Sequence, residues 1–296
     1  MTQNPNTTFS KQDWMSHITD IDHLTLSEIV WPGAHNAGMD LKAPDHGALV
    51  GIWMSCQDDS FAWQLANGAR ALDLRLVYDS AAAPPAFIFH HNGERSGRTL
   101  DEMISAVIAF LDAHPDEFIL LDFHELGYEG RAFDYVKFRT LLVSRLGNRI
   151  IPRSSRDKTL GELKSASSKQ RVILAAPAKR ELDDDYFWER IHHRWSGEDI
   201  IDEDELKQFI SKTLASLDSG AMLWSLSATT YSILSGPQRI KDSIDDWFDP
   251  ARHWISRCSI INVDFFDDSN IVRYCWRATR TKASYGEAFY QRLSAE

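Results

Sequence analysis

The chain contains three stretches that decide its expected fold: Trp31-Pro-Gly-Ala-His35-Asn36, Ala71-Leu-Asp73-Leu-Arg75 and Phe87-Ile-Phe-His90-His91. Each stretch predicts a β-strand that ends on a histidine or an arginine. Two histidines can take a proton from a nucleophile and give one to a leaving group, and an arginine can hold the charge that builds on phosphorus. Together the three stretches predict a site that cleaves a phosphodiester without a metal ion.

Strands alternate with helices along the rest of the chain. Apolar runs predict further strands at residues 118–123, 171–176, 222–226 and 259–265. Helices are predicted at residues 61–68, 99–113 and 133–146. Thr99 and Glu102 form a capping-box pattern at the start of the second helix. Such alternation is typical of βαβ units and a parallel sheet.

Five polar residues fall at or just after the ends of five predicted strands: His35, Arg75, His91, His124 and Asp264. In parallel α/β sheets, functional groups gather at the carboxyl ends of the strands. Five such residues at one edge favour an α/β fold closed into a (β/α) barrel with one active site. Because the late strands are weakly marked, we expect an irregular TIM barrel, forming a single domain over residues 1–296.

Charge and composition exclude several classes of protein. The net charge is −11, from 32 basic and 43 acidic residues, which argues against nucleic-acid binding because that needs a basic surface. No apolar run approaches the roughly 18 residues of a membrane-spanning helix. Residues 1–13 contain no apolar signal-peptide core, so we expect a protein that is cytoplasmic as synthesised. A secretion route without a cleavable signal stays open, and any membrane contact is expected to be peripheral and transient.

Several candidate residues also have structural interpretations. Asp73 and Arg75 lie on the same face of their strand and could form a structural ion pair. Asp264 lies near the end of the predicted strand at 259–265, where it could cap a helix instead of orienting an imidazole. His90 and His91 point in opposite directions on a strand, so only one of them can face the site.

These motifs resemble the phosphatidylinositol-specific phospholipase C X-domain family, in its bacterial and single X-domain forms. The resemblance covers residues 14–126 and rests on Pro-Gly-Ala-His35, the segment 64–75, His90-His91-Asn-Gly and the segment 110–122. It implies an irregular TIM barrel that cleaves phosphatidylinositol or a related phospholipid to diacylglycerol and a cyclic phosphorylated head group.

The resemblance also implies roles for single residues. His35 corresponds to the general base and His91 to the general acid, while Arg75 stabilises the transition state. Asp264 orients the base histidine, and Asp73, beside Arg75, completes the expected catalytic set. The alternatives are a metal-dependent glycerophosphodiester or sphingomyelinase-type barrel, and a non-catalytic lipid-binding scaffold.

The chain departs from the family pattern at several positions. Asn36 follows the first histidine, where bacterial members carry an aspartate. Calcium-dependent relatives share this asparagine but place carboxylates on the next strand, where this chain has Arg75, so we expect no cofactor, no metal site and no need for calcium. His124 stands where a lysine is expected, and Ala175-Ala176-Pro177 offers no arginine. The head-group pocket is therefore expected to be rebuilt.

Four residues are expected to bind the substrate: Asn36, His90, His124 and Trp53. Trp53 belongs to the apolar stretch Leu49-Val-Gly-Ile-Trp53-Met54, which follows the first strand. An apolar loop that contains a tryptophan can enter a bilayer interface. The same loop could instead fold over the mouth of the barrel.

Overall fold

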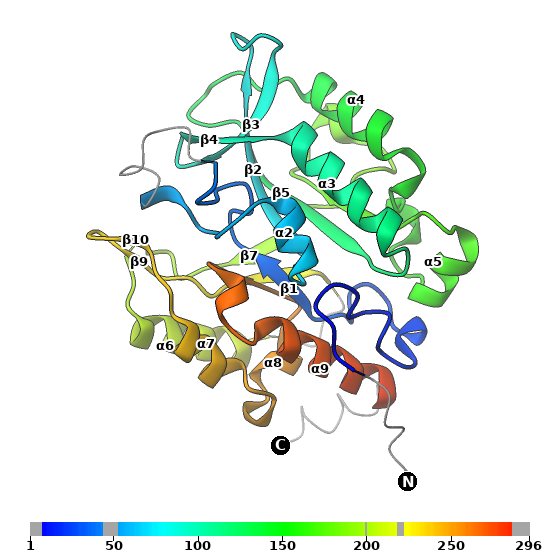
Figure 1. The fold of residues 1–296 in the computed structure, drawn as a ribbon, viewed down its shortest axis with the longest axis vertical. Coiled ribbons are helices and arrows are strands. Elements are labelled where there is room, and N and C mark those ends of the chain that lie inside the picture. The colour runs from blue at the N-terminus through cyan, green and yellow to red at the C-terminus, as the bar shows by residue number, and fades with distance from the viewer. Residues whose placement is uncertain (1–7, 44–52, 199, 218–221, 286–296) are drawn as a thin grey trace.

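The structure is a computed structural model, which describes residues 8–43, 53–198, 200–217 and 222–285. Its framework is one large sheet surrounded by helices (Figure 1). The strands of this sheet are β1 (Trp31–Ala34), β2 (Ala71–Asp79), β3 (Ala86–His91), β4 (Glu94–Thr99), β5 (Ile119–Leu126), β6 (Val172–Ala175), β7 (His192–Arg194), β8 (Trp224–Ser227) and β11 (Ile260–Val263). A separate antiparallel pair consists of β9 (Tyr231–Ser232) and β10 (Gly236–Pro237).

The helices pack around the sheet (Figure 1). They are α2 (Phe61–Ala66), α3 (Leu100–Ala113), α4 (Tyr135–Leu146), α5 (Leu160–Ala166), α6 (Glu203–Ala215), α7 (Lys241–Phe248), α8 (Trp254–Arg257) and α9 (Ile271–Tyr285). Helix α3 begins as its sequence indicates. The Thr99 side chain accepts a hydrogen bond from the Glu102 backbone N–H, and the Glu102 carboxylate accepts one from the Thr99 N–H. None of the described helices is both long enough and apolar enough to cross a membrane.

Seven strands of the sheet run parallel, in the order β6-β5-β2-β1-β11-β8-β7. The two outer strands curl toward each other, but among the described residues only two isolated bridges, Ile150–Val172 and Ala175–Trp188, continue the sheet beyond β6 on that side. The sheet is therefore a curled half-barrel, similar to a TIM barrel, and not the closed barrel that we expected. β7 contains only three residues, and all three pair with β8.

Strand β2 extends beyond the parallel sheet, and β3 and β4 continue from it as an antiparallel meander. We expected β3 to be a further parallel strand, and that expectation was wrong. β2 has nine residues, and its second half pairs with β3, with Leu76 opposite Phe89. Because β3 runs back down along β2, its last residues, His90 and His91, return toward the middle of β2, where Arg75 lies.

Candidate active site

The first histidine of the site is held between the ends of two neighbouring parallel strands. Ala34 of β1 pairs with Val263 of β11, so the residues that follow them, His35 and Asp264, lie side by side. Nδ1 of His35 is 2.7 Å from Oδ1 of Asp264. The Gln57 side-chain amide donates to the carbonyls of both His35 (2.8 Å) and Val263 (3.0 Å) and ties the strand ends together. A carboxylate on Nδ1 fixes the imidazole proton there and leaves the Nε2 lone pair facing the site.

Two glycines make this arrangement possible. A Cβ atom on Gly33 of β1 would lie 2.1 Å from Oδ1 of Asn262, so only glycine allows β1 to approach β11 this closely. A Cβ atom on Gly38 would lie 2.2 Å from the ring of Phe89, on β3. The first close approach sets β1 against β11, and the second sets the turn after His35 against β3.

Arg75 and Asp73 form a buried pair beside His35. One terminal nitrogen of Arg75 lies 3.1 Å from Oδ2 of Asp73 and 3.2 Å from Nε2 of His35. The pairing of β2 with β5 shifts between Leu74 and Arg75, an irregularity of the kind that re-aims a side chain. Burial would raise the pKa of the Asp73 carboxyl, but the charges of Arg75 and of three nearby histidines hold this pKa well below its usual range. Asp73 therefore stays ionised and fixes the guanidinium.

His91 is the histidine of β3 that faces His35. Their ring centroids are 6.4 Å apart, with the rings edge to face. Burial lowers the pKa of His91 to about 3, with further contributions from the charges of Arg75 and His35. His90 points the other way: it is fully buried, its ring lies 5.5 Å from Tyr128, and burial lowers its pKa to about 4. As arranged, His90 offers no exposed atom to a substrate.

The partners of His91 are neutral, and sequence reasoning missed them. Nδ1 of His91 lies 3.3 Å from the carbonyl oxygen of Met54 and 3.9 Å from Sγ of Cys56. The Asn36 side-chain amide donates to the same sulfur at 3.6 Å. Burial raises the pKa of the Cys56 thiol well above its usual value, so the thiol stays protonated. A backbone carbonyl and a protonated thiol are therefore the neighbours of Nδ1 of His91.

Asn36 makes the turn after the first histidine. Its φ of +43° lies in the left-handed region, which asparagine tolerates better than most residues. Its backbone N–H donates to Oδ2 of Asp73 at 3.2 Å, and the residue is 1% exposed. The Oδ1 atom of Asn36 has no hydrogen-bond partner among the described residues. Trp53 is half-buried, and residues 49–52 of the expected lipid-contacting loop lie outside the described residues.

His124 belongs to a second histidine cluster, on β5 and β7. Its ring stacks on that of His193 with centroids 3.6 Å apart. Nε2 of His193 lies 2.7 Å from Oδ2 of Asp122, which neighbours Asp73 in the sheet. The intervening strand β6 places the small residue Ala175 beside Asp122, and this leaves room for His193 to reach across. Sequence reasoning did not place His193 in the site, and the lone charge of Asp122 in an apolar strand was the available signal.

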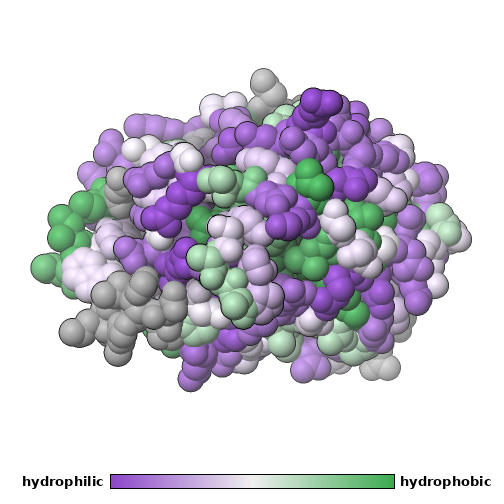
Figure 2. Space-filling view, turned by 90° about the horizontal axis from the view of Figure 1, so that it is seen from above, coloured by the Kyte–Doolittle hydropathy of each residue, from purple (hydrophilic) through white to green (hydrophobic). Residues whose placement is uncertain are grey.

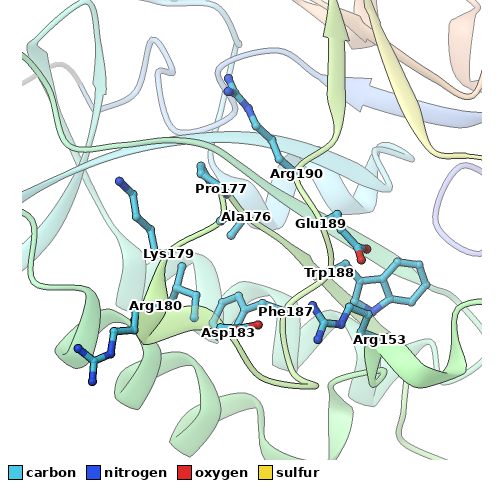
Figure 3. A pocket seen from close by; sticks show the side chains of 12 residues that line it. Arg153, Ala176, Pro177, Lys179, Arg180, Asp183, Phe187, Trp188, Glu189 and Arg190 are labelled. Carbon is cyan, nitrogen blue, oxygen red and sulfur yellow. The ribbon is translucent and has the colours of Figure 1, made fainter.

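A cavity of about 570 Å³ opens where the chain leaves β6, and Figure 3 shows the residues that line it. Its walls carry four basic side chains, those of Arg153, Lys179, Arg180 and Arg190. In Figure 3 the Arg190 side chain points away from Lys179 and Arg180. The cavity shares no residue with the cluster around His35, so it is a separate feature of the same edge of the sheet.

Comparisons with known proteins relate this chain to phospholipases C. No family model matches the chain. It is 27% identical over 233 residues to the variant-surface-glycoprotein phospholipase C of Trypanosoma cruzi, an alignment that covers 69% of this chain. The chain spans about 60% of the length of that relative.

Two bacterial crystal structures share the fold. A mutant of phosphatidylinositol-specific phospholipase C from Staphylococcus aureus superposes with a TM-score of 0.69 and 17% identity, covering 91% of this chain and 98% of that one. The phosphatidylinositol-specific phospholipase C of Listeria monocytogenes gives a TM-score of 0.68 and 14% identity, with the same coverage. The chain has the fold of the bacterial phosphatidylinositol-specific phospholipases C and is similar in sequence to a phospholipase C.

Proposed function

We propose that the protein is a phospholipase C-type phosphodiesterase that cleaves phosphatidylinositol or a related phospholipid without a metal ion. The observation that carries this proposal is the convergence of three groups: His35 with Asp264 on its Nδ1, Arg75 on its Nε2 side, and the ring of His91 opposite. These groups supply a base, a cation and an acid around one space. The fold and the sequence relative support the same activity.

The first chemical step is an attack within the substrate. Nε2 of His35 takes the proton from the inositol 2-hydroxyl, whose oxygen then forms a bond to phosphorus. Asp264 stabilises the imidazolium that results, since it already accepts the Nδ1 proton at 2.7 Å. The bond between phosphorus and the diacylglycerol oxygen breaks, and the product is a cyclic inositol phosphate.

His91 gives its proton to the departing diacylglycerol oxygen. In the free protein, burial and the nearby positive charges keep the pKa of His91 at about 3. A phosphodiester brings a negative charge between Arg75 and His91 when it binds, and an opposite charge raises the pKa of an imidazole. The substrate therefore helps to protonate its own general acid. The neutral partners Met54 and Cys56 leave this pKa free to respond.

Arg75 takes the place of a metal ion. Its guanidinium is permanently charged and is fixed by the ionised Asp73, so it stands ready for the charge that develops on the phosphoryl oxygens. We assign no cofactor to the reaction. His124, on the strand β5 that neighbours β2, is the proposed contact of the head group, whereas Asn36 is buried and holds the turn after His35.

The phospholipid reaches the site from a membrane surface, and an exposed apolar turn marks a docking point. The loop after β8 carries the pair β9 and β10, and the residues between them include Ile233 and Leu234, which are 61% and 86% exposed. Figure 1 shows this hairpin reaching out at the left, and Figure 2 shows apolar residues at the same end of the molecule. Because the loop follows the carboxyl end of β8, it shares the edge of the sheet with the site.

Replacing Leu234 with aspartate should weaken binding to phosphatidylinositol vesicles by about tenfold or more, since burying a leucine side chain contributes roughly 1.5–3 kcal/mol. Co-sedimentation with vesicles measures the change. Met222→Asp is the matched control, because Met222 is 77% exposed but precedes β8, at the opposite edge of the sheet. Equal effects of the two changes would rule out this docking point.

The activity is tested by incubating the purified protein with phosphatidylinositol in mixed micelles and in EDTA. We expect diacylglycerol and a water-soluble cyclic phosphate, identified by mass spectrometry, at a rate that EDTA does not change. A rate that EDTA abolishes and Ca²⁺ or Mg²⁺ restores would replace the proposal with a metal-dependent mechanism. Lipid binding without any product from a panel of phospholipids would make the protein a scaffold.

A further inference from the structure

A second cluster of chemically active side chains lies one strand away from the proposed reaction site. It consists of Asp122 and His124 on β5 and His193 on β7. One ligand-capable atom of each residue lies within 4.8 Å of those of the other two. Neither the proposed reaction nor the comparisons use Asp122 or His193.

Two polar atoms of this cluster are buried without a partner. Oδ1 of Asp122 and Nδ1 of His124 have no hydrogen-bond partner among the described residues, and Asp122 is only 2% exposed. An unsatisfied buried polar atom is costly, and native structures contain few of them. Asp122 has one ion pair among the described residues, with His193, and no lysine or arginine lies within salt-bridge distance of it. A group that binds at this place would satisfy both atoms.

The chemistry of the cluster favours a cation over an anion. Imidazole nitrogens and a carboxylate oxygen offer lone pairs, and they are the donors that zinc and similar transition metals prefer. The register also places Asp122 directly beside Asp73, and Arg75 neutralises only the second of these two carboxylates. A phosphate or another anion would meet an excess of negative charge here.

We propose that Asp122, His124 and His193 form a binding site for one divalent transition-metal ion of the zinc type, which shares His124 with the proposed head-group site but contains none of the catalytic residues. A tetrahedral ion held by three protein ligands keeps one position open for water or a substrate oxygen. The ion lies in the plane of each imidazole that binds it, so uptake turns one of the two stacked rings about its Cβ–Cγ bond. The His124 ring can turn without losing a hydrogen bond at Nδ1, because that atom has none.

The site is tested by direct binding to the full chain, which needs no activity assay. Protein stripped with EDTA and dialysed is titrated with ZnCl₂ by calorimetry and with CoCl₂ by visible absorption. We expect one ion per chain, with the cobalt bands of a tetrahedral nitrogen and oxygen site. His193→Ala and His124→Ala each remove a ligand, so each should lower the affinity for the metal ion strongly. The loss should exceed the roughly 10–100-fold that results when a residue hydrogen-bonded to a ligand is replaced. His192→Ala is the matched control, because His192 is the exposed neighbour of His193 on β7.

Two further variants decide between the possible explanations of any uptake. Arg190 is exposed, and its positive charge acts on Asp122 and His124, so Arg190→Ala should strengthen cation binding. Uptake that persists in His193→Ala but is lost in Cys56→Ser, with a sulfur-to-cobalt charge-transfer band, would place the ion at His35, Cys56 and Asp264 and overturn the proposal. Absence of zinc and cobalt uptake by wild-type protein whose circular dichroism shows it folded would overturn it as well. The proposed phospholipase C activity is measured in EDTA, so its result does not depend on whether this metal site exists.

Discussion

Replacing His91 with alanine should lower the rate of phosphatidylinositol cleavage by roughly 10²–10⁴-fold, and His35→Ala should lower it by a similar factor. The reason is that each variant removes one of the two proton-transfer groups while Arg75 remains in place. The rates are measured as release of the water-soluble inositol phosphate product from mixed micelles. Circular dichroism and urea unfolding show whether each variant remains folded.

The two histidines are distinguished by the leaving group of the substrate. In an inositol phosphate ester of a phenol with a low pKa, the phenolate leaves without taking up a proton. Cleavage of this ester therefore needs no general acid but still needs the base. His91→Ala should recover most of the wild-type rate on this ester, whereas His35→Ala should not. If both variants lose the same factor on both substrates, His91 is not the general acid, and the assignment of roles fails.

Sequence reasoning could locate most of the candidate site because the end of each strand is visible in the local sequence pattern. His35 and Asp264 each follow an apolar strand by one residue, and parallel pairing of those strands is enough to bring them together. The choice between His90 and His91 could not be made in the same way. It depends on the antiparallel return of β3 along β2, which is set by the turn between them and not by the pattern of β3 itself.

The sequence pattern could not predict contacts made by backbone atoms or by residues distant in sequence. The carbonyl of Met54 and the thiol of Cys56 hold His91 from a segment whose composition carries no catalytic signal. The prediction of the last strands of the sheet was limited for a different reason. β7 has three residues and β8 and β11 have four each, which is too few for alternation to mark the buried face, so closure of the barrel could not be judged.

Replacing Arg75 with alanine should have two separate effects. The rate should fall by at least roughly 10²–10³-fold, the cost of removing one group that stabilises charge in a transition state. The free energy of unfolding should also fall, by about 3–5 kcal/mol, because Asp73 is left as an unpaired buried charge. Urea unfolding at neutral pH measures the second effect and initial rates on folded protein measure the first.

The double variant Asp73→Asn, Arg75→Ala separates catalysis from stability. An amide in place of the carboxylate removes the unpaired charge, so the double variant should regain a large part of the stability that Arg75→Ala loses. It should regain none of the activity, because the cation that faces the phosphoryl oxygens is still missing. Activity that returned together with stability would mean that Arg75 acts only as the structural partner of Asp73. Activity that stays lost in a stable protein leaves the guanidinium itself as the group that makes a metal ion unnecessary.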